Sequence, residues 1–140
     1  MIATTDRIRR ATDGNDDIID LTDEVQGVIA DSGVVTGQAV VMVVGSTAAI
    51  STLEYEPGLV KRDIAAAYER IAPRNASYLH EETWNDDNGH SHVRATITGP
   101  SAAFPIVDGS IPLGTWQQIV LIDFDTRARK RDVVVSIVGV

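Results

Sequence analysis

Two stretches of the chain repeat apolar residues at spacings of three and four, the spacing typical of helices with one buried face. The first is expected to begin at Thr22, whose hydroxyl can cap a helix, and to stop at Gly33 after Ser32. The second lies between Pro57, which suits the first turn of a helix, and Pro73, which ends it. The pattern therefore predicts two main helices.

Strand patterns fill most of the remaining chain. Residues 38–44 form a continuous apolar run, which predicts a strand buried on both faces. Residues 93–98 alternate apolar and polar positions, as a strand with one buried face does. Two long strands are expected over residues 116–124 and 132–138.

The turns between these strands indicate how they are connected. Asp108-Gly109 lies between two apolar runs and is the strongest hairpin signal in the chain. Several strands joined by short turns, together with only two main helices, predict an α+β fold. We expect a mostly antiparallel β-sheet sandwich in a single domain over residues 1–140.

Composition excludes several classes of protein. Hydrophobic residues make up 44% of the chain and charged residues 23%, an ordinary globular balance. The formal net charge of −8 at pH 7 argues against a general nucleic-acid binder, which needs a basic face. No apolar run is long enough to span a membrane, no apolar leader is visible, and the absence of cysteine excludes disulfides and thiolate metal sites. We therefore expect a cytoplasmic protein with neither nucleic-acid nor membrane partners.

Cationic residues gather between the two final apolar runs, at Arg127, Arg129, Lys130 and Arg131. Charge runs in such positions usually face water, so we expect a solvated hairpin turn here. The alternative is an anion site.

All three histidines fall between His80 and His92. On the strand expected there, His90 and His92 would project to the same face, with His80 arriving from the preceding loop. Three imidazoles with a water molecule are typical of a catalytic zinc site, and the same groups could act as general acids or bases near neutral pH. The alternative is a set of exposed loop histidines among acidic neighbours.

Two further segments carry groups that could bind a substrate. Ser46 and Thr47 follow a buried strand in a run of small residues, where hydroxyls could contact phosphate oxygens. Close strand packing explains the small residues equally well. Thr115, Gln117 and Gln118 lie at the start of another strand, where one glutamine amide should face inward and hold a substrate or a neighbouring chain.

These segments include strings that occur together in one family. The relevant strings are Tyr78-Leu79-His80, Gly89-His90-Ser91-His92-Val93-Arg94-Ala95 and Leu113-Gly114-Thr115-Trp116-Gln117-Gln118-Ile119. With them the chain resembles the YjbQ family, long labelled an uncharacterised protein family. The resemblance covers nearly the whole chain and is most specific over residues 78–124.

The resemblance implies an α+β sandwich assembled as a homotrimer, with sites in clefts at or near subunit boundaries. It maps the family's histidines onto His80, His90 and His92, which would line a metal or anion site, so that zinc or magnesium is the expected cofactor. It also implies a secondary thiamine-phosphate synthase activity. That reaction joins a hydroxymethylpyrimidine diphosphate to a thiazole phosphate and releases pyrophosphate.

We accordingly expect a small-molecule transferase acting on a phosphorylated substrate. His80, His90 and His92 would ligate a metal or transfer protons, and Glu54 would serve as an acid or support one of these groups. The substrate would be contacted in the same cleft by Ser46, Thr47, Thr115 and Gln117. The alternative is a non-catalytic metal- or ligand-binding trimer, or a structural trimer with vestigial histidines.

The chain departs from the family at Gly45. Many members carry a histidine there, before the small residues that include Ser46 and Thr47, whereas another group shares the Gly-Ser-Thr form. The substrate and metal preferences of the family are therefore not transferred whole to this chain.

Overall fold

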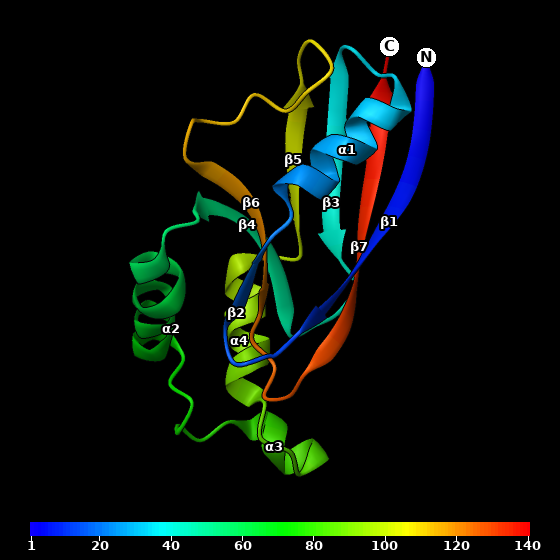
Figure 1. Ribbon diagram of the computed structural model, residues 1–140. Helices are drawn as coiled ribbons and strands as arrows, with labels where there is room; N and C mark the ends of the chain where they lie inside the picture. Colours follow the sequence, from blue (N-terminus) through cyan, green and yellow to red (C-terminus); the bar gives the residue numbers. More distant parts are fainter.

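A computed structural model describes residues 1–140, arranged as two antiparallel β-sheets with helices (Figure 1). The larger sheet has four strands in the order β1 (Ile2–Thr12), β7 (Arg129–Gly139), β3 (Gly37–Val43) and β5 (Ser101–Ile106). The smaller sheet has three strands in the order β2 (Asp17–Asp20), β6 (Gln117–Asp123) and β4 (Ala48–Glu54). The prediction of an α+β fold with antiparallel sheets is confirmed.

The helices are divided between the two sheets. In Figure 1, α1 (Thr22–Ser32) crosses the four-stranded sheet, whereas α2 (Ile64–Ile71) and α4 (Gly89–Thr98) lie beside the three-stranded sheet. A π-helical segment, η1 (Leu59–Asp63), leads into α2, and the short α3 (Leu79–Trp84) precedes α4. None of the helices is long and apolar enough to cross a membrane.

The three-stranded sheet is buried on both faces, because its alternate residues enter two separate apolar clusters. Ile50 and Leu121 belong to the larger cluster, which also takes residues from α1 and the four-stranded sheet. Their neighbours Ala49 and Ile122 belong to the smaller cluster, which includes Ala95 of α4. Since successive side chains of a strand point to opposite faces, this alternation places the sheet between two layers of the molecule.

Both predicted helices and the predicted hairpin turn are confirmed. The predicted cap is wrong, because the Thr22 hydroxyl makes no capping hydrogen bond and accepts instead from the Ile119 backbone nitrogen at 2.9 Å. Gly33 ends α1 with a left-handed backbone at φ 73°, and α2 stops before Pro73. Asp108 and Gly109 have φ angles of 50° and 78°, the positive values that a tight hairpin turn requires. In this turn Val107 pairs with Ser110.

Two predictions about strands are wrong. Strand β3 buries alternate residues only: Val41 is buried whereas Met42 is exposed, so one of its faces is open in the single chain. Residues 93–98, predicted as a strand, are helical and belong to α4. Their alternation misleads because the two branched residues, Val93 and Ile97, are 38% and 56% exposed.

The residue that α4 buries instead is charged. The Arg94 guanidinium donates to the Ala72 carbonyl, at 3.0 Å from Nε and 2.9 Å from Nη2, and to Asp16, at 2.9 and 2.8 Å from Nη1. Arg94 Nη2 also donates to Glu69 Oε2 at 2.7 Å. A charge can be buried where such partners surround it, and this clamp ties α4 to the end of α2.

Candidate functional site

The residues expected to share one cleft lie at two ends of the three-stranded sheet. Thr47 precedes β4 and accepts a hydrogen bond at its carbonyl from the Phe124 backbone nitrogen, 2.9 Å away. At the other end of the same strand, Glu54 pairs with Gln117 of β6. A strand of seven residues spans about 20 Å, so Ser46 and Thr47 are separated from the other set by that length. That other set is Glu54, Thr115 and Gln117.

The histidines are likewise not gathered at one point. Successive residues of an α-helix are rotated by about 100°, so His90 and His92 of α4 point to nearly opposite sides. The inference that they share a strand face is therefore wrong. His92 lies against His80 of α3, with ring centroids 4.3 Å apart and planes tilted by 52°.

His90 faces the interior. Its side chain is fully buried and lies near Tyr78, with ring centroids 6.4 Å apart. His90 Nδ1 has no hydrogen-bond partner. Burial, with Arg94 and Arg74 nearby, lowers the pKa of His90 below its ordinary value of 6.5, so the ring is neutral at pH 7.

The predicted three-histidine metal set does not fit a single centre in one chain. His90 is turned away from His80 and His92, and no group of three or more His, Cys, Asp or Glu side chains is arranged to hold a metal ion. The pair formed by His80 and His92 alone offers two imidazoles. A catalytic zinc usually takes three protein ligands.

His80 is held by the loop that joins α3 to α4. The amide nitrogen of Asn88, oriented to satisfy its hydrogen bonds, donates to the Asp86 carboxylate at 3.0 and 3.2 Å and to His80 Nε2 at 3.1 Å. Asp86 Oδ1 also lies 3.5 Å from His80 Nε2. Asn88 is buried, so this contact positions the His80 ring against His92.

His92 lines a polar pocket of about 280 Å³, and none of the side chains that line this pocket is hydrophobic. The pocket joins the segment before β4 to the start of β7. It is lined by Gly45, Ser46, Thr47, Asn88, His92, Asp125, Arg129 and Arg131. Three of the predicted site residues, Ser46, Thr47 and His92, therefore do come together.

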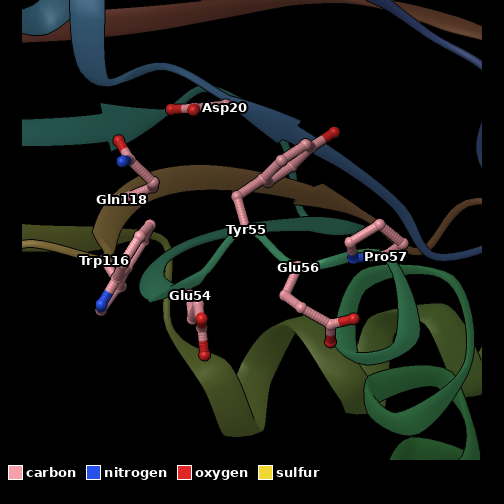
Figure 2. Close-up of a pocket in the computed structure, with 7 residues that line it drawn as sticks. All are labelled: Asp20, Glu54, Tyr55, Glu56, Pro57, Trp116 and Gln118. Carbon is pink, nitrogen blue, oxygen red and sulfur yellow. The ribbon is translucent and has the colours of Figure 1, made fainter.

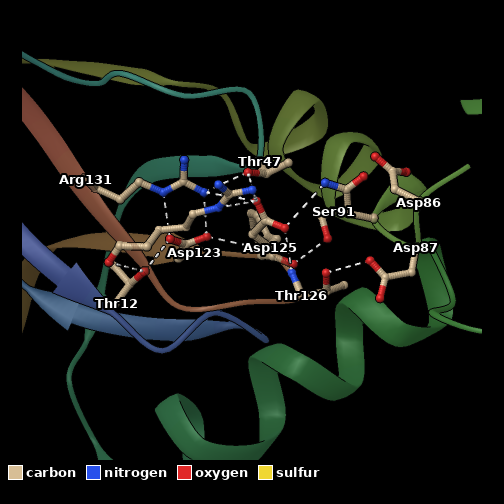
Figure 3. A network of polar contacts seen from close by, with 12 residues as sticks. Thr12, Thr47, Asp86, Asp87, Ser91, Asp123, Asp125, Thr126 and Arg131 are labelled. Carbon is tan, nitrogen blue, oxygen red and sulfur yellow. Dashed lines mark hydrogen bonds and ion pairs between the residues drawn. The ribbon is translucent and has the colours of Figure 1, made fainter. Parts of the chain in front are cut away.

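The floor of this pocket is a network of buried ion pairs, drawn in Figure 3. Arg131 Nε donates to Asp123 Oδ2 at 2.7 Å, and Arg131 Nη2 donates to Asp123 Oδ1 at 2.9 Å and to Thr47 Oγ1 at 2.7 Å. The Thr12 hydroxyl donates to Asp123 Oδ2 at 2.5 Å. Arg131 is only 7% exposed, so the prediction that it belongs to a solvated turn is wrong.

Asp125 organises the other side of the network. Its Oδ2 accepts from Thr47 Oγ1 at 3.0 Å and from Arg129 Nε at 3.0 Å, and its Oδ1 accepts from the Thr126 backbone nitrogen at 2.8 Å. Burial raises the pKa of Asp125, but the hydrogen bonds from Thr126, Thr47 and Arg129 outweigh it and leave the pKa below its ordinary value. Asp125 is therefore an ionised carboxylate at pH 7.

The sequence analysis interpreted Arg129 and Arg131 as part of a solvated turn and did not pair them with Asp123 and Asp125. Asp123 and Asp125 are two residues apart after a buried strand, and Arg129 and Arg131 have the same spacing before another. The equal spacing of the two acidic and the two basic residues on either side of the turn could have predicted that they form ion pairs with each other. It was overlooked because exposed charges commonly occupy hairpin turns.

His92 remains neutral in this pocket at pH 7. Burial lowers its pKa most, and His80 lowers it further, while Asp125, Asp86 and the Ser46 backbone act in the opposite direction. A neutral imidazole presents one nitrogen as a donor and the other as an acceptor. His92 can therefore both hydrogen-bond a ligand and accept a proton.

The far end of the sheet carries a different pocket, of about 390 Å³, shown in Figure 2. Its lining is acidic and aromatic: Asp20, Glu54, Tyr55, Glu56, Pro57, Trp116 and Gln118. The neighbouring Gln117 is occupied within its own chain, since its Nε2 donates to Thr52 Oγ1 at 3.1 Å and its Oε1 accepts from Gly114 at 3.1 Å. Thr115 is exposed and lines neither pocket.

Comparison with known proteins finds one family throughout. The model of the family described as "UPF0047 protein YjbQ-like" matches residues 6–140. A UPF0047 protein from Methanothermobacter thermautotrophicus is 39% identical over 123 residues, which are 88% of this chain and 83% of that protein. The UPF0047 protein YugU of Bacillus subtilis is 29% identical over 81% of this chain and 84% of its own length.

Solved structures agree with the sequence comparison. A crystal structure of a YbjQ-like protein of unknown function from Sulfolobus solfataricus has a TM-score of 0.92 and 33% identity, covering 99% of this chain and 98% of that one. A hypothetical protein from Aeropyrum pernix has a TM-score of 0.89 and 31% identity, covering 98% and 99%. The fold is therefore shared along the whole chain.

Proposed function

This chain belongs to the UPF0047 protein YjbQ-like family, and we propose that it is a cytoplasmic enzyme acting on phosphorylated small molecules at the polar pocket beside His92. The reaction we propose is of the thiamine-phosphate synthase type. A hydroxymethylpyrimidine diphosphate loses pyrophosphate as its C–O bond breaks, and the ring nitrogen of a thiazole phosphate forms the new C–N bond with its lone pair. The electron pair of the broken bond leaves on pyrophosphate.

The single observation that carries this proposal is the purely polar pocket with two arginines in its lining. Negative charge grows on pyrophosphate as it departs, so donors fixed in advance at that position lower the barrier. Arg131 and Arg129 are held by Asp123 and Asp125, which sets the direction of their remaining N–H groups. Arginine also suits phosphate geometry, because its planar fork offers several donors.

His92 supplies the proton chemistry in this proposal. Its neutral ring can donate one N–H group to the diphosphate, and a proton taken from water on the other nitrogen adds a positive charge opposite the departing pyrophosphate. His80 positions that ring by direct contact, and Ser46 and Thr47 border the same pocket. No step is assigned to a metal, because the three histidines do not meet in one chain.

The remaining expected residues favour a homotrimer with sites shared between chains. Glu54, Thr115 and Gln117 lie at the other end of the three-stranded sheet, about 20 Å from the histidine pocket and beyond the reach of any side chain. They would contact a substrate in that pocket only from another copy. In a cyclic trimer each chain presents one end of its sheet to the next, which generates three equivalent sites.

The test is the release of pyrophosphate from the purified protein supplied with both thiamine precursors. We expect turnover that falls about 100-fold or more in His92→Asn, the usual loss for a general acid–base residue. Arg70→Gln, on the exposed side of α2, should leave turnover unchanged. A wild-type rate equal to that of His92→Asn would refute the reaction, and phosphate binding without turnover would favour a non-catalytic ligand-binding trimer.

A further inference from the structure

One amino group of Arg131 is left free by the network that holds the rest of its side chain. Nε and Nη2 bond to Asp123 and Thr47, whereas Nη1 makes no hydrogen bond or ion pair within the chain. The side chain is 9% exposed, and Arg131 lines the polar pocket. A guanidinium group that is nine-tenths buried therefore keeps one donor without a partner at the edge of the pocket.

The two buried carboxylates do not compete for that donor. Asp123 Oδ1 accepts from Arg131 Nη2 and from the Asp125 backbone nitrogen, and Asp123 Oδ2 accepts from Arg131 Nε and Thr12. Asp125 Oδ2 accepts from Thr47 and Arg129. Since these carboxylate oxygens are occupied, an anion entering the pocket is the natural acceptor for Arg131 Nη1.

Gly45 determines whether the free amino group can be reached. A Cβ atom at this position would lie 2.5 Å from Arg131 Nη1, well inside the distance at which real atoms pack. The end of an arginine normally moves aside from such a contact at little cost. Here the movement would pull Nη2 away from Asp123 and Thr47, because the guanidinium is planar and rigid.

Gly45 also lies where the polar pocket adjoins a second hollow, of about 210 Å³. Gly45 and Ser46 line both spaces. The second hollow is bordered by small and apolar groups, including Ala48, Ala95 and Pro100. A ligand that crosses Gly45 would therefore meet charge on one side and an apolar surface on the other.

We propose that Gly45 is a specificity-determining residue, which opens Arg131 Nη1 to a phosphoryl oxygen and lets an apolar group attached to that phosphoryl lie in the adjoining hollow. The ligand class is a phosphate ester of a small, largely apolar organic group. This inference deepens the proposed function, since it rests on the same pocket. It adds a recognition element that the proposed reaction does not itself require.

The test measures binding by calorimetry with two probes, inorganic phosphate and benzyl phosphate. The wild-type protein should bind both, and benzyl phosphate more tightly, because only benzyl phosphate fills the apolar hollow. Gly45→Ala should weaken both by about tenfold or more, the usual effect of losing a hydrogen bond from a charged group. Gly33→Ala is the matched control, since Gly33 also has a positive φ and a Cβ atom there meets nothing within 4 Å, and its affinities should equal those of the wild type.

A second measurement needs no substitution in the protein being observed, so it does not depend on the Gly45→Ala variant folding. In wild-type protein with ¹⁵N-labelled arginine, phosphate should shift the side-chain signals of Arg131, which are assigned by their loss in Arg131→Lys. Unshifted Arg131 signals, equal affinity in Gly45→Ala, or no phosphate binding would each overturn the inference. Binding with these features but no pyrophosphate release would instead refute only the proposed reaction.

Discussion

The rings of His80 and His92 lie with their centroids 4.3 Å apart, so a proton on one ring is opposed by a proton on the other. His80 lowers the pKa of His92 for this reason, in addition to the larger effect of burial. The side chain at position 80 therefore helps to set the pKa of His92.

We expect His80→Gln to raise the pKa of His92, because the substitution removes the opposing charge. Burial remains, so the pKa should stay below 6.5. The ring proton signals of the histidines in a nuclear magnetic resonance titration measure this directly, since the chain has only three. A His92 pKa that is unchanged or lower in His80→Gln would contradict the effect assigned to His80.

The buried His90 ring should make the protein less stable in acid. Its pKa is lowered in the folded chain, so below pH 6.5 the unfolded state binds more protons and the free energy of unfolding falls with pH. The contribution of neutral His90 to the free energy of unfolding is fully present above pH 6.5. It decreases as the pH falls toward the pKa of His90 in the folded state. One such group contributes at most about 1.4 kcal/mol per pH unit.

His90→Phe should flatten this dependence, because phenylalanine keeps the ring but binds no proton. Denaturant unfolding of both proteins at pH 7.5 and pH 5.5 gives the comparison. Part of the acid sensitivity should persist, since the pKa of His92 is lowered as well. Equal losses in the two proteins would show that His90 is protonated as easily when folded as when unfolded.

The ion pair between Arg131 and Asp123 should be sensitive to the loss of one partner. Asp123→Asn leaves a buried guanidinium without its counter-charge, and we expect the free energy of unfolding to fall by about 3–5 kcal/mol. Replacing both residues together, as in Asp123→Leu with Arg131→Met, should recover much of that loss.

A pair on the surface provides the control for this experiment. Arg9 Nε lies 2.9 Å from Asp132 Oδ1, but the Arg9 side chain is 73% exposed. Arg9→Ala should leave the unfolding midpoint nearly unchanged, because water and salt screen exposed pairs. If Asp123→Asn and Arg9→Ala behaved alike, the network in the pocket floor would not be the rigid support described for it.

Sites shared between chains should be restored by mixing inactive variants. His92→Asn and Glu54→Gln alter opposite ends of the sheet, so a mixed trimer can place an intact His92 beside an intact Glu54 from the next chain. An equal random mixture should recover about a quarter of wild-type pyrophosphate release, because each site then has both intact halves with that frequency.

Mixing His92→Asn with His80→Asn is the matched control. Both substitutions affect the same end of one chain, so every site formed in that mixture contains a defect. No recovery in either mixture would mean that Glu54 does not complete the histidine pocket. The trimer itself is checked independently by sedimentation of the wild-type protein.

Local patterns allowed the sequence to predict much of the fold. The helix that ends at Gly33 and the turn at Asp108 were predictable, because a helix period and a positive-φ dipeptide are properties of neighbouring residues. The helical state of α4 was not, since its stability depends on Arg94 finding Asp16 and the Ala72 carbonyl far away in the sequence. Long-range partners of that kind leave no periodic signal.

In the candidate site too, the features that depend on local sequence were predicted and those that depend on long-range contacts were not. Ser46, Thr47 and His92 were predicted and do line one pocket, because each belongs to a segment with unusual composition. The separation of His90 from His92 was missed once residues 93–98 were interpreted as a strand. The role of Arg131 was missed because its burial depends on Asp123, which belongs to another strand.

The burial of the three-stranded sheet on both faces has a consequence for any assembly of this protein. Ile50 and Ala49 face opposite apolar layers, so the centre of neither surface of the sheet is available for binding, and a partner can reach the sheet only at the strand ends or along the outer strands β2 and β4. The separation between the histidine pocket and the acidic, aromatic pocket is then fixed by the length of β4. Neighbouring copies can bring the two pockets together only if their spacing matches that length. Inserting or deleting two residues in β4 would keep the alternation of its side chains but would move the two pockets out of alignment between copies.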